Sequence, residues 1–196
     1  EPAQEAREGG LDEIVVTARR REESAQDVPI SISAFSGDQL EAQSAVKVTD
    51  IARLTPNLVV TPGGGSGTGG VVIGIRGQVQ TDTIGSLDPS VGIYVDGVYW
   101  ARSNGANADL VDIDRGEVLK GPQGTLFGRN TTGGALSITT GAPDPTRVSG
   151  LIQGRIGNFG QHDFASVLNL PLVTDKVALR LSGNKLNNNG FNRNLT

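Results

Sequence analysis

The chain has 196 residues and a net charge of −4, from 17 basic and 21 acidic side chains. This balance excludes a general nucleic-acid binder, because no basic excess exists to neutralise phosphates. The absence of cysteine excludes disulfides, zinc–thiolate centres and thiol nucleophiles, and no apolar run reaches the ~18 residues of a transmembrane helix.

The N-terminal segment, residues 1–26, is rich in charge and contains one apolar run, DEIVVTA at residues 12–18. Its composition predicts a flexible segment. The chain has no methionine, so Glu1 is not expected to be a translation start. A cleaved signal peptide is the simplest explanation, and an excised fragment is the alternative.

Residues 27–145 combine strand and helix signals. Apolar and polar residues alternate over residues 28–35, which predicts a strand. Ser36 and Gln39 have capping-box spacing, which predicts a helix at about 38–45, and Pro56 ends a second helix at about 49–54. The expected fold is an α+β domain with a small mixed sheet, its further strands at 58–61, 71–76, 91–95, 97–100, 114–120 and 134–140.

Three long, polar, glycine-rich segments lie between these strands, at residues 62–70, 78–90 and 101–108. Connections in compact domains have a median of ~4–6 residues, and longer ones are often functional. These segments are therefore candidate binding loops.

Residues 146–196 differ from the rest in charge and pattern, with six basic and two acidic side chains. The boundary is expected at the double-proline sequence 143–145. Three segments alternate between apolar and polar residues over ~9–11 positions, as transmembrane β-strands do, although half-buried strands of a soluble sandwich show the same pattern. Three strands cannot close a barrel, and open sheet edges do not occur in lipid, so membrane strands would predict a longer protein.

Several catalytic and metal-binding motifs are missing. The glycine-rich segment 121–134 lacks the spacing of a phosphate-binding loop, and residues 63–70 lack the context of a dinucleotide site. The acidic residues Asp109, Asp112, Asp114 and Glu117 lack the order of a calcium loop, and His162 is the only histidine. The sequence predicts no catalytic residue, no metal site and no cofactor.

Four motifs occur in a fixed order along the chain: DEIVVTA at 12–18, IRG at 75–77, YVDGVY at 94–99, and EVLKGPQGTLFGRNTTGGALSI at 117–138. With the alternating strands that follow, they resemble the N-terminal part of TonB-dependent outer-membrane receptors. The resemblance covers a TonB box, a complete plug domain and the first barrel strands. Gly116 departs from it, since the family usually has an apolar residue at that position.

The resemblance implies that residues 27–145 form a plug and that residues 146–196 form the first three strands of a barrel with about 22 strands. A plug of residues 12–144 would be roughly 36 Å across, and such a barrel leaves a lumen of roughly 34 Å, whereas ~16 strands leave about 22 Å. The implied location is the outer membrane of a Gram-negative bacterium, with the plug and N-terminus facing the periplasm.

The implied function is energised import of a scarce, bulky nutrient rather than enzyme catalysis. A ferric siderophore is the first expectation, and cobalamin, glycans and other bulky nutrients are alternatives. The implied partners are TonB, the bulky ligand and outer-membrane lipid, with no nucleic acid. A soluble periplasmic or secreted β-rich binding module is the alternative function, and an enzyme with carboxylate chemistry is a third.

Candidate site residues follow from the same comparison. An extended segment can add to a partner's sheet edge, so the expected TonB-binding residues are Asp12, Glu13, Ile14, Val15, Val16, Thr17 and Ala18. The expected contacts between plug and barrel are Arg76, Lys120 and Arg129. The expected structural glycines are Gly77, Gly97, Gly121, Gly124, Gly128, Gly133 and Gly134.

The ligand surface is expected at the tips of the three long loops, where binding residues concentrate. The individual candidates are Gln80, Asp82, Trp100 and Arg102. Arg102 would attract an anionic ligand. A buried structural role is the alternative for Trp100.

Overall fold

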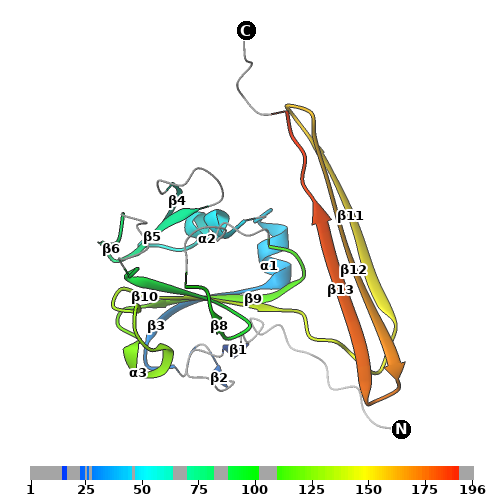
Figure 1. Cartoon of the computed structure of the whole chain (residues 1–196), viewed down its shortest axis with the longest axis horizontal. Helices are drawn as coiled ribbons and strands as arrows, with labels where there is room; N and C mark the ends of the chain where they lie inside the picture. The colour runs from blue at the N-terminus through cyan, green and yellow to red at the C-terminus, as the bar shows by residue number, and fades with distance from the viewer. Residues whose placement is uncertain are drawn as a thin grey trace. The chain divides into compact units, whose positions relative to one another are not determined.

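A computed structural model describes residues 15–16, 23–24, 26, 28–45, 47–63, 70–81, 88–101 and 110–189 (Figure 1). The chain forms two compact units. The first contains Glu1–Asp109 and Arg115–Thr139, and the second contains Leu110–Asp114 and Thr140–Thr196. The segment Leu110–Asp114 therefore belongs with the C-terminal strands, although the sequence alone assigns it to the preceding domain.

The first unit is built on a five-stranded sheet with the order β3-β9-β10-β7-β8. Neighbours β3 and β9 are antiparallel, β10 and β7 are parallel, and β7 and β8 are antiparallel, which confirms the expected mixed sheet. Valine, leucine and isoleucine side chains fill β7, β9 and β10 and are buried. The strands are β3 (Ser31–Ser36), β7 (Val91–Val95), β8 (Val98–Tyr99), β9 (Ile113–Lys120) and β10 (Gly134–Thr140).

Two short helices, α1 (Gly37–Ala42) and α2 (Val48–Leu54), lie near β9 and supply buried Leu40 and Ile51. The predicted capping box is present at the start of α1: the Gln39 N–H donates to Ser36 Oγ at 3.2 Å, and the Ser36 N–H donates to Gln39 Oε1 at 3.2 Å. A Cβ placed on Gly116 would lie 3.5 Å from Leu40 and 3.9 Å from Ile51, so both helices approach β9 there.

A second sheet in this unit contains β4 (Leu58–Pro62), β5 (Val71–Ile75) and β6 (Gln78–Val79) in antiparallel order. Strand β6 occupies the first two residues of a predicted loop. It forms because Arg76 and Gly77 both have positive φ (52° and 80°), the geometry of a tight hairpin turn. Asp96 and Gly97 make the same kind of turn between β7 and β8.

Three smaller elements complete the first unit. Strands β1 (Val15–Val16) and β2 (Glu23–Ser24) form an antiparallel two-stranded sheet. Helix α3 (Gly124–Phe127), which the sequence analysis did not predict, lies inside the glycine-rich motif. Among the described residues, none of the helices has both the length and the apolar character needed to cross a membrane.

The second unit is an antiparallel sheet of three long strands, β11 (Ser149–Gly157), β12 (Gln161–Val173) and β13 (Val177–Lys185) (Figure 1). Residues that face each other in an antiparallel ladder lie on the same side of the sheet. The register pairs Leu168 with Leu181 and Leu170 with Leu179. The predicted apolar residues thus share one side, here called the apolar face: Ile152, Ile156, Phe164, Leu168, Leu170, Val177, Leu179 and Leu181.

Within the described part of the chain the apolar face is exposed, with Ile152 75% and Ile156 86% exposed. The opposite side, here called the polar face, carries Arg155, Asp163, Asn169 and Arg180. A sheet whose apolar side remains exposed needs either another layer of protein or an apolar solvent.

Candidate functional site

Two residues of the expected TonB-binding segment, Val15 and Val16, form strand β1. Val15 pairs with Ser24 and Val16 pairs with Glu23, so four residues of the segment that the sequence predicts to be flexible form a ladder instead. Val16 is fully buried against Val28, Leu119 and other members of the core. Burial of one valine side chain stabilises by about 1.5–3 kcal/mol, which explains this departure from the prediction. Asp12, Glu13, Ile14, Thr17 and Ala18 lie outside the described residues.

A buried ion pair lies on the sheet side that receives Val16. Arg115, Glu117 and Leu119 alternate along β9, so all three point to one side of the sheet. The Arg115 Nε lies 3.3 Å from Glu117 Oε1, and Glu117 is buried. The sequence analysis considered the Glu117 carboxylate only as part of an acidic group that lacks the order of a calcium loop. In the sequence RGEVL, Glu117 and Leu119 are two positions apart, so on a strand the carboxylate faces the same side as a core leucine.

The glycine-rich motif is joined to the YVDGVY hairpin by aromatic and polar contacts. The Tyr94 hydroxyl donates to the Phe127 carbonyl at 2.6 Å, and the two rings have centroids 5.0 Å apart. The Asn130 side-chain amide donates to the Tyr99 hydroxyl at 3.0 Å. These contacts connect the end of α3 to β7 and β8, so the glycine-rich motif packs directly on the YVDGVY hairpin.

The expected structural glycines separate into two groups. A Cβ on Gly134 would lie 2.2 Å from the Leu119 carbonyl oxygen, and its φ is +148°, so only glycine fits there. Gly124 differs, because its Cβ would meet open space within the described residues and its φ is not positive, so the structural role expected for it stays a prediction. The remaining predicted glycines have positive φ or a close neighbour: Gly77, Gly97, Gly121, Gly128 and Gly133.

The three cations expected to contact the barrel differ in their surroundings. Arg129 forms an exposed ion pair with Asp88, Nη1 to Oδ2 3.8 Å, and such pairs contribute little. Arg76 lies at the β5–β6 turn, and its Nη1 would be 3.3 Å from a Cβ placed on Gly121, which follows Lys120 at the end of β9. Within the described part of the chain, neither Arg76 nor Lys120 has an acidic partner.

Two of the four expected ligand residues are described. Gln80 follows β6 and Trp100 follows β8, and both are half-buried. The Trp100 N–H donates to the Ile93 carbonyl at 2.8 Å, which fixes the backbone at the start of the third loop. The base of the first loop is closed by a hydrogen bond from the Gly63 N–H to the Gly70 carbonyl at 3.2 Å. Asp82 and Arg102 lie outside the described residues.

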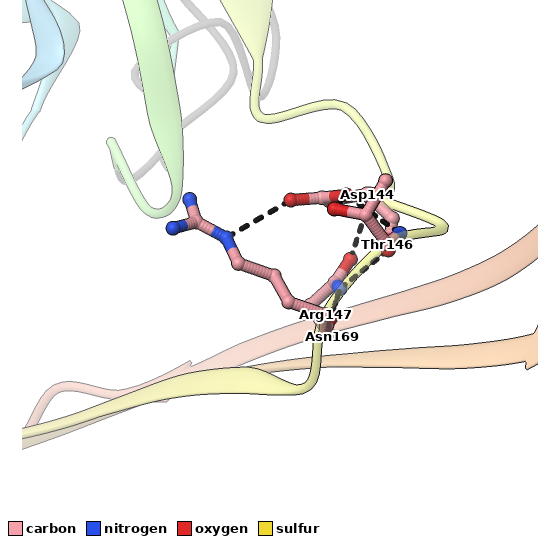
Figure 2. Close-up of polar contacts among 4 residues, drawn as sticks. All are labelled: Asp144, Thr146, Arg147 and Asn169. Atoms are coloured by element: carbon pink, nitrogen blue, oxygen red, sulfur yellow. Dashed lines mark hydrogen bonds and ion pairs between the residues drawn. The ribbon is translucent and has the colours of Figure 1, made fainter. Parts of the chain in front are cut away.

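The connection into β11 is held by a polar cluster (Figure 2). Asn169 of β12 is buried; its amide donates to the carbonyls of Asp144 (2.9 Å) and Arg147 (2.8 Å) and accepts from the Asp144 N–H (2.8 Å). The Thr146 hydroxyl and N–H and the Arg147 guanidinium all donate to the Asp144 carboxylate. The Thr146 donors, with the help of Arg147, lower the pKa of Asp144 below its usual value.

The profile of the TonB-dependent receptor plug domain matches residues 24–135. The chain belongs to the TonB-dependent receptor family. Its sequence is 34% identical to the iron-regulated outer membrane virulence protein of Vibrio cholerae over 71% of this chain and 21% of that protein. It is 30% identical to the hemin receptor of Yersinia pestis over 92% of this chain and 27% of the receptor.

The fold gives the same assignment. The ferric yersiniabactin uptake receptor from Yersinia pestis superposes with a TM-score of 0.69 and 26% identity, over 80% of this chain and 24% of that structure. The chain spans about a quarter of the length of the relatives it matches. The first unit therefore contains a plug domain, and β11–β13 correspond to the first barrel strands of a TonB-dependent receptor.

Proposed function

We propose that this chain is the plug and first wall strands of an importer that uses TonB-coupled energy to carry a ferric siderophore across the outer membrane. The observation that carries the proposal is a plug domain followed directly by three strands whose apolar face is exposed within the described part of the chain. In the complete receptor the apolar face contacts lipid, and the polar face lines the lumen of the barrel. A soluble binding module would need a further layer of protein over this face.

Residues 12–18 are the proposed TonB-binding strand. An extended, apolar segment pairs with a partner's sheet edge through main-chain hydrogen bonds. In this structure Val16 is not available to a partner, because its side chain is buried and its backbone pairs with Glu23. Binding of the partner must first extract the Val16 side chain, which costs about 1.5–3 kcal/mol. The two-residue β1–β2 ladder is short enough for a longer partner strand to replace it.

Arg76 and Lys120 are the proposed plug contacts to carboxylates of the barrel wall. Neither has an acidic partner among the described residues, and an arginine fork suits a carboxylate. Arg129 contributes less, because Asp88 already competes for it. We expect Arg76→Ala to loosen the plug, measured as faster amide exchange of β5 and β6 in the purified receptor, and Arg129→Ala to have no such effect. Equal exchange in both variants would remove Arg76 from this role.

The ligand surface is proposed at the loop tips that carry Gln80, Asp82, Trp100 and Arg102. Backbone hydrogen bonds at Gly63 and Trp100 hold the base of the first loop and the start of the third. We expect the Trp100→Ala, Arg102→Ala double variant to weaken ferric siderophore binding in a fluorescence titration. A dissociation constant within about twofold of wild type would exclude both residues from the site.

Uptake tests the proposed function as a whole. A host without its own siderophore receptors would express the complete receptor under iron limitation, with catecholate and hydroxamate ferric siderophores or hemin as iron sources. We expect growth on a ferric siderophore that requires both the receptor and TonB. Growth on hemin alone would correct the ligand, and no growth on any source, or growth without TonB, would contradict the proposal.

Val15→Pro is the matched test of the TonB-binding strand. Proline removes a main-chain donor from the strand, so we expect uptake to be lost while ligand binding is retained. Gln4→Pro is the control, since it places the same residue in the same N-terminal segment outside residues 12–18. Unchanged uptake in the Val15→Pro receptor would refute strand pairing at this position.

A further inference from the structure

Asp112 and Arg180 form a two-pronged ion pair within the second unit. The Arg180 Nε donates to Asp112 Oδ2 at 2.7 Å and its Nη2 donates to Oδ1 at 2.5 Å. The two side chains are 9% and 24% exposed, so water screens the pair little. A planar guanidinium fork on a carboxylate is the strong and geometrically specific form of an ion pair.

Gly141 completes this arrangement from a third chain segment. Its N–H donates to the Asp112 carbonyl at 2.8 Å. A Cβ on Gly141 would lie 2.8 Å from Asp112 Oδ1 and 2.9 Å from Arg180 Nε, so a side chain there would separate the fork from its carboxylate. Asp112 itself has a φ of 56°, a backbone region that L residues adopt at a cost and that the surrounding contacts hold in place.

These three residues occupy special positions along the chain. Asp112 immediately precedes β9, Gly141 immediately follows β10, and Arg180 lies on the polar face of β13. Strands β9 and β10 are neighbours in the plug sheet. The ion pair therefore ties the start of β9 to β13, and the Gly141–Asp112 hydrogen bond joins the end of β10 to it. All three residues belong to the second unit.

We infer that Asp112 and Arg180 are positioning residues that keep the ends of β9 and β10 fixed to the wall while TonB pulls on the N-terminal segment. The inference rests on the proposed transport function. A pull on residues 12–18 acts on the first unit, and the plug would move as a whole if no other contact held it. Loss of either partner leaves a charge with little access to water, so the arrangement opens when one partner is removed.

The test compares Arg180→Met with Arg155→Met in the complete receptor. Arg155 lies on the same polar face, but its contact with Asp163 is longer, at 4.0 Å, and joins only β11 to β12. We expect the Gly141 amide to exchange with solvent at least about tenfold faster in the Arg180→Met receptor, because the Asp112 carbonyl is no longer held. The Arg155→Met receptor is expected to match wild type.

The second readout is outer-membrane permeability to vancomycin in cells that express each receptor. We expect Arg180→Met to raise vancomycin susceptibility only when TonB is present, which a purely structural role would not produce. If Arg180→Met fails to reach the membrane, Asp112→Asn keeps the side-chain shape and provides the same comparison.

Equal Gly141 exchange in the Arg180→Met and Arg155→Met receptors would overturn the inference, and so would a permeability increase that is independent of TonB. The exchange measurement does not depend on transport. Failure of the proposed function would therefore appear in the Val15→Pro uptake assay, and failure of this inference would appear in the exchange of Gly141.

Discussion

The five-stranded plug sheet and the β11–β13 sheet differ in how they bury their apolar residues. In the plug sheet, Val118, Leu119 and Leu136 are buried, because helices, the second small sheet and the β1–β2 ladder supply cover from the same chain. In the β11–β13 sheet, Ile152 and Ile156 remain exposed. The difference shows that alternation predicts which side of a strand is apolar but not what covers that side.

The polar sides differ as well. The plug sheet has a buried ion pair between Arg115 and Glu117 on the side that Val16 packs against. The polar face of β11–β13 carries charged and amide groups that bind other segments: Arg180 binds Asp112, and Asn169 binds the connection at Asp144. Strands β11–β13 thus have one apolar side, and the side chains of their other side bind other segments of the chain.

The largest expected effect separates the two faces of β11. Leu151 and Ile152 are adjacent and both exposed (48% and 75%), but only Ile152 lies on the apolar face. A lysine in the lipid-facing band costs up to about 2–4 kcal/mol near the bilayer midplane. We expect Ile152→Lys to reduce the folded yield of the complete receptor on heat-modifiability gels, and Leu151→Lys to change it little. A larger loss with Leu151→Lys would reverse the assignment of the faces.

The next effect tests the packing of Val16 of the β1–β2 ladder against the plug sheet. Val16→Ala removes two buried carbons, worth about 1.6 kcal/mol, and so loosens this ladder. We expect tighter binding of a TonB C-terminal fragment to the resting receptor, measured by calorimetry, because less energy is spent on release. Val59→Ala, an exposed change on β4, is the control. Weaker binding of the Val16→Ala receptor would mean that TonB contacts this side chain directly.

A smaller effect concerns the glycine that departs from the family pattern. A Cβ on Gly116 meets Leu40 and Ile51 at ordinary contact distances, and glycine inside a strand costs roughly 0.5–1 kcal/mol relative to alanine. We therefore expect Gly116→Ala to raise the stability of the plug by about that amount in denaturant unfolding. Gly134→Ala is the opposite control, because its Cβ would collide with the Leu119 carbonyl. Destabilisation by Gly116→Ala would show that α1 and α2 pack too closely on β9 to accommodate a methyl group.

The smallest expected effect depends on pH. The pKa of Asp144 is lowered by Thr146 and Arg147, so its carboxylate stabilises the connection above its usual pKa of 3.8 and loses this contribution as pH falls through the lower folded value. We expect the exchange of the Thr146 amide to rise in acid below that range, and Asp144→Asn to remove this dependence. The same acid response in the Asp144→Asn receptor would assign it to another group.

Local features of this fold were predictable from the sequence. Residues 91–95 and 134–140 form strands with the predicted bounds, and the Ser36–Gln39 capping box starts a helix as expected. Strand alternation and capping chemistry involve neighbours in the chain, so their signals are complete within a short window. The apolar face of β13 was predictable for the same reason.

The long-range contacts were not predictable. Arg180 and Asp112 are 68 positions apart, and the sequence marked Asp112 only as part of an acidic group without the order of a calcium loop. Val16 belongs to a run that favours a free strand, and only the core near Leu119 explains its burial. Strand β6 and helix α3 are too short to produce a periodic signal. These features depend on which segments meet, and alternation along one strand does not encode that.

The central claim is that the apolar face of β11–β13 meets lipid while the opposite side does not. The chain contains no cysteine, so a single cysteine gives one spin label at a chosen position. Labels at positions 181 and 182 of the complete receptor in lipid vesicles would sample the two sides of β13. The account predicts high collision rates with oxygen at Leu181→Cys and higher accessibility to a water-soluble nickel chelate at Ser182→Cys. Equal accessibility at the two positions, or the reverse order, would contradict it.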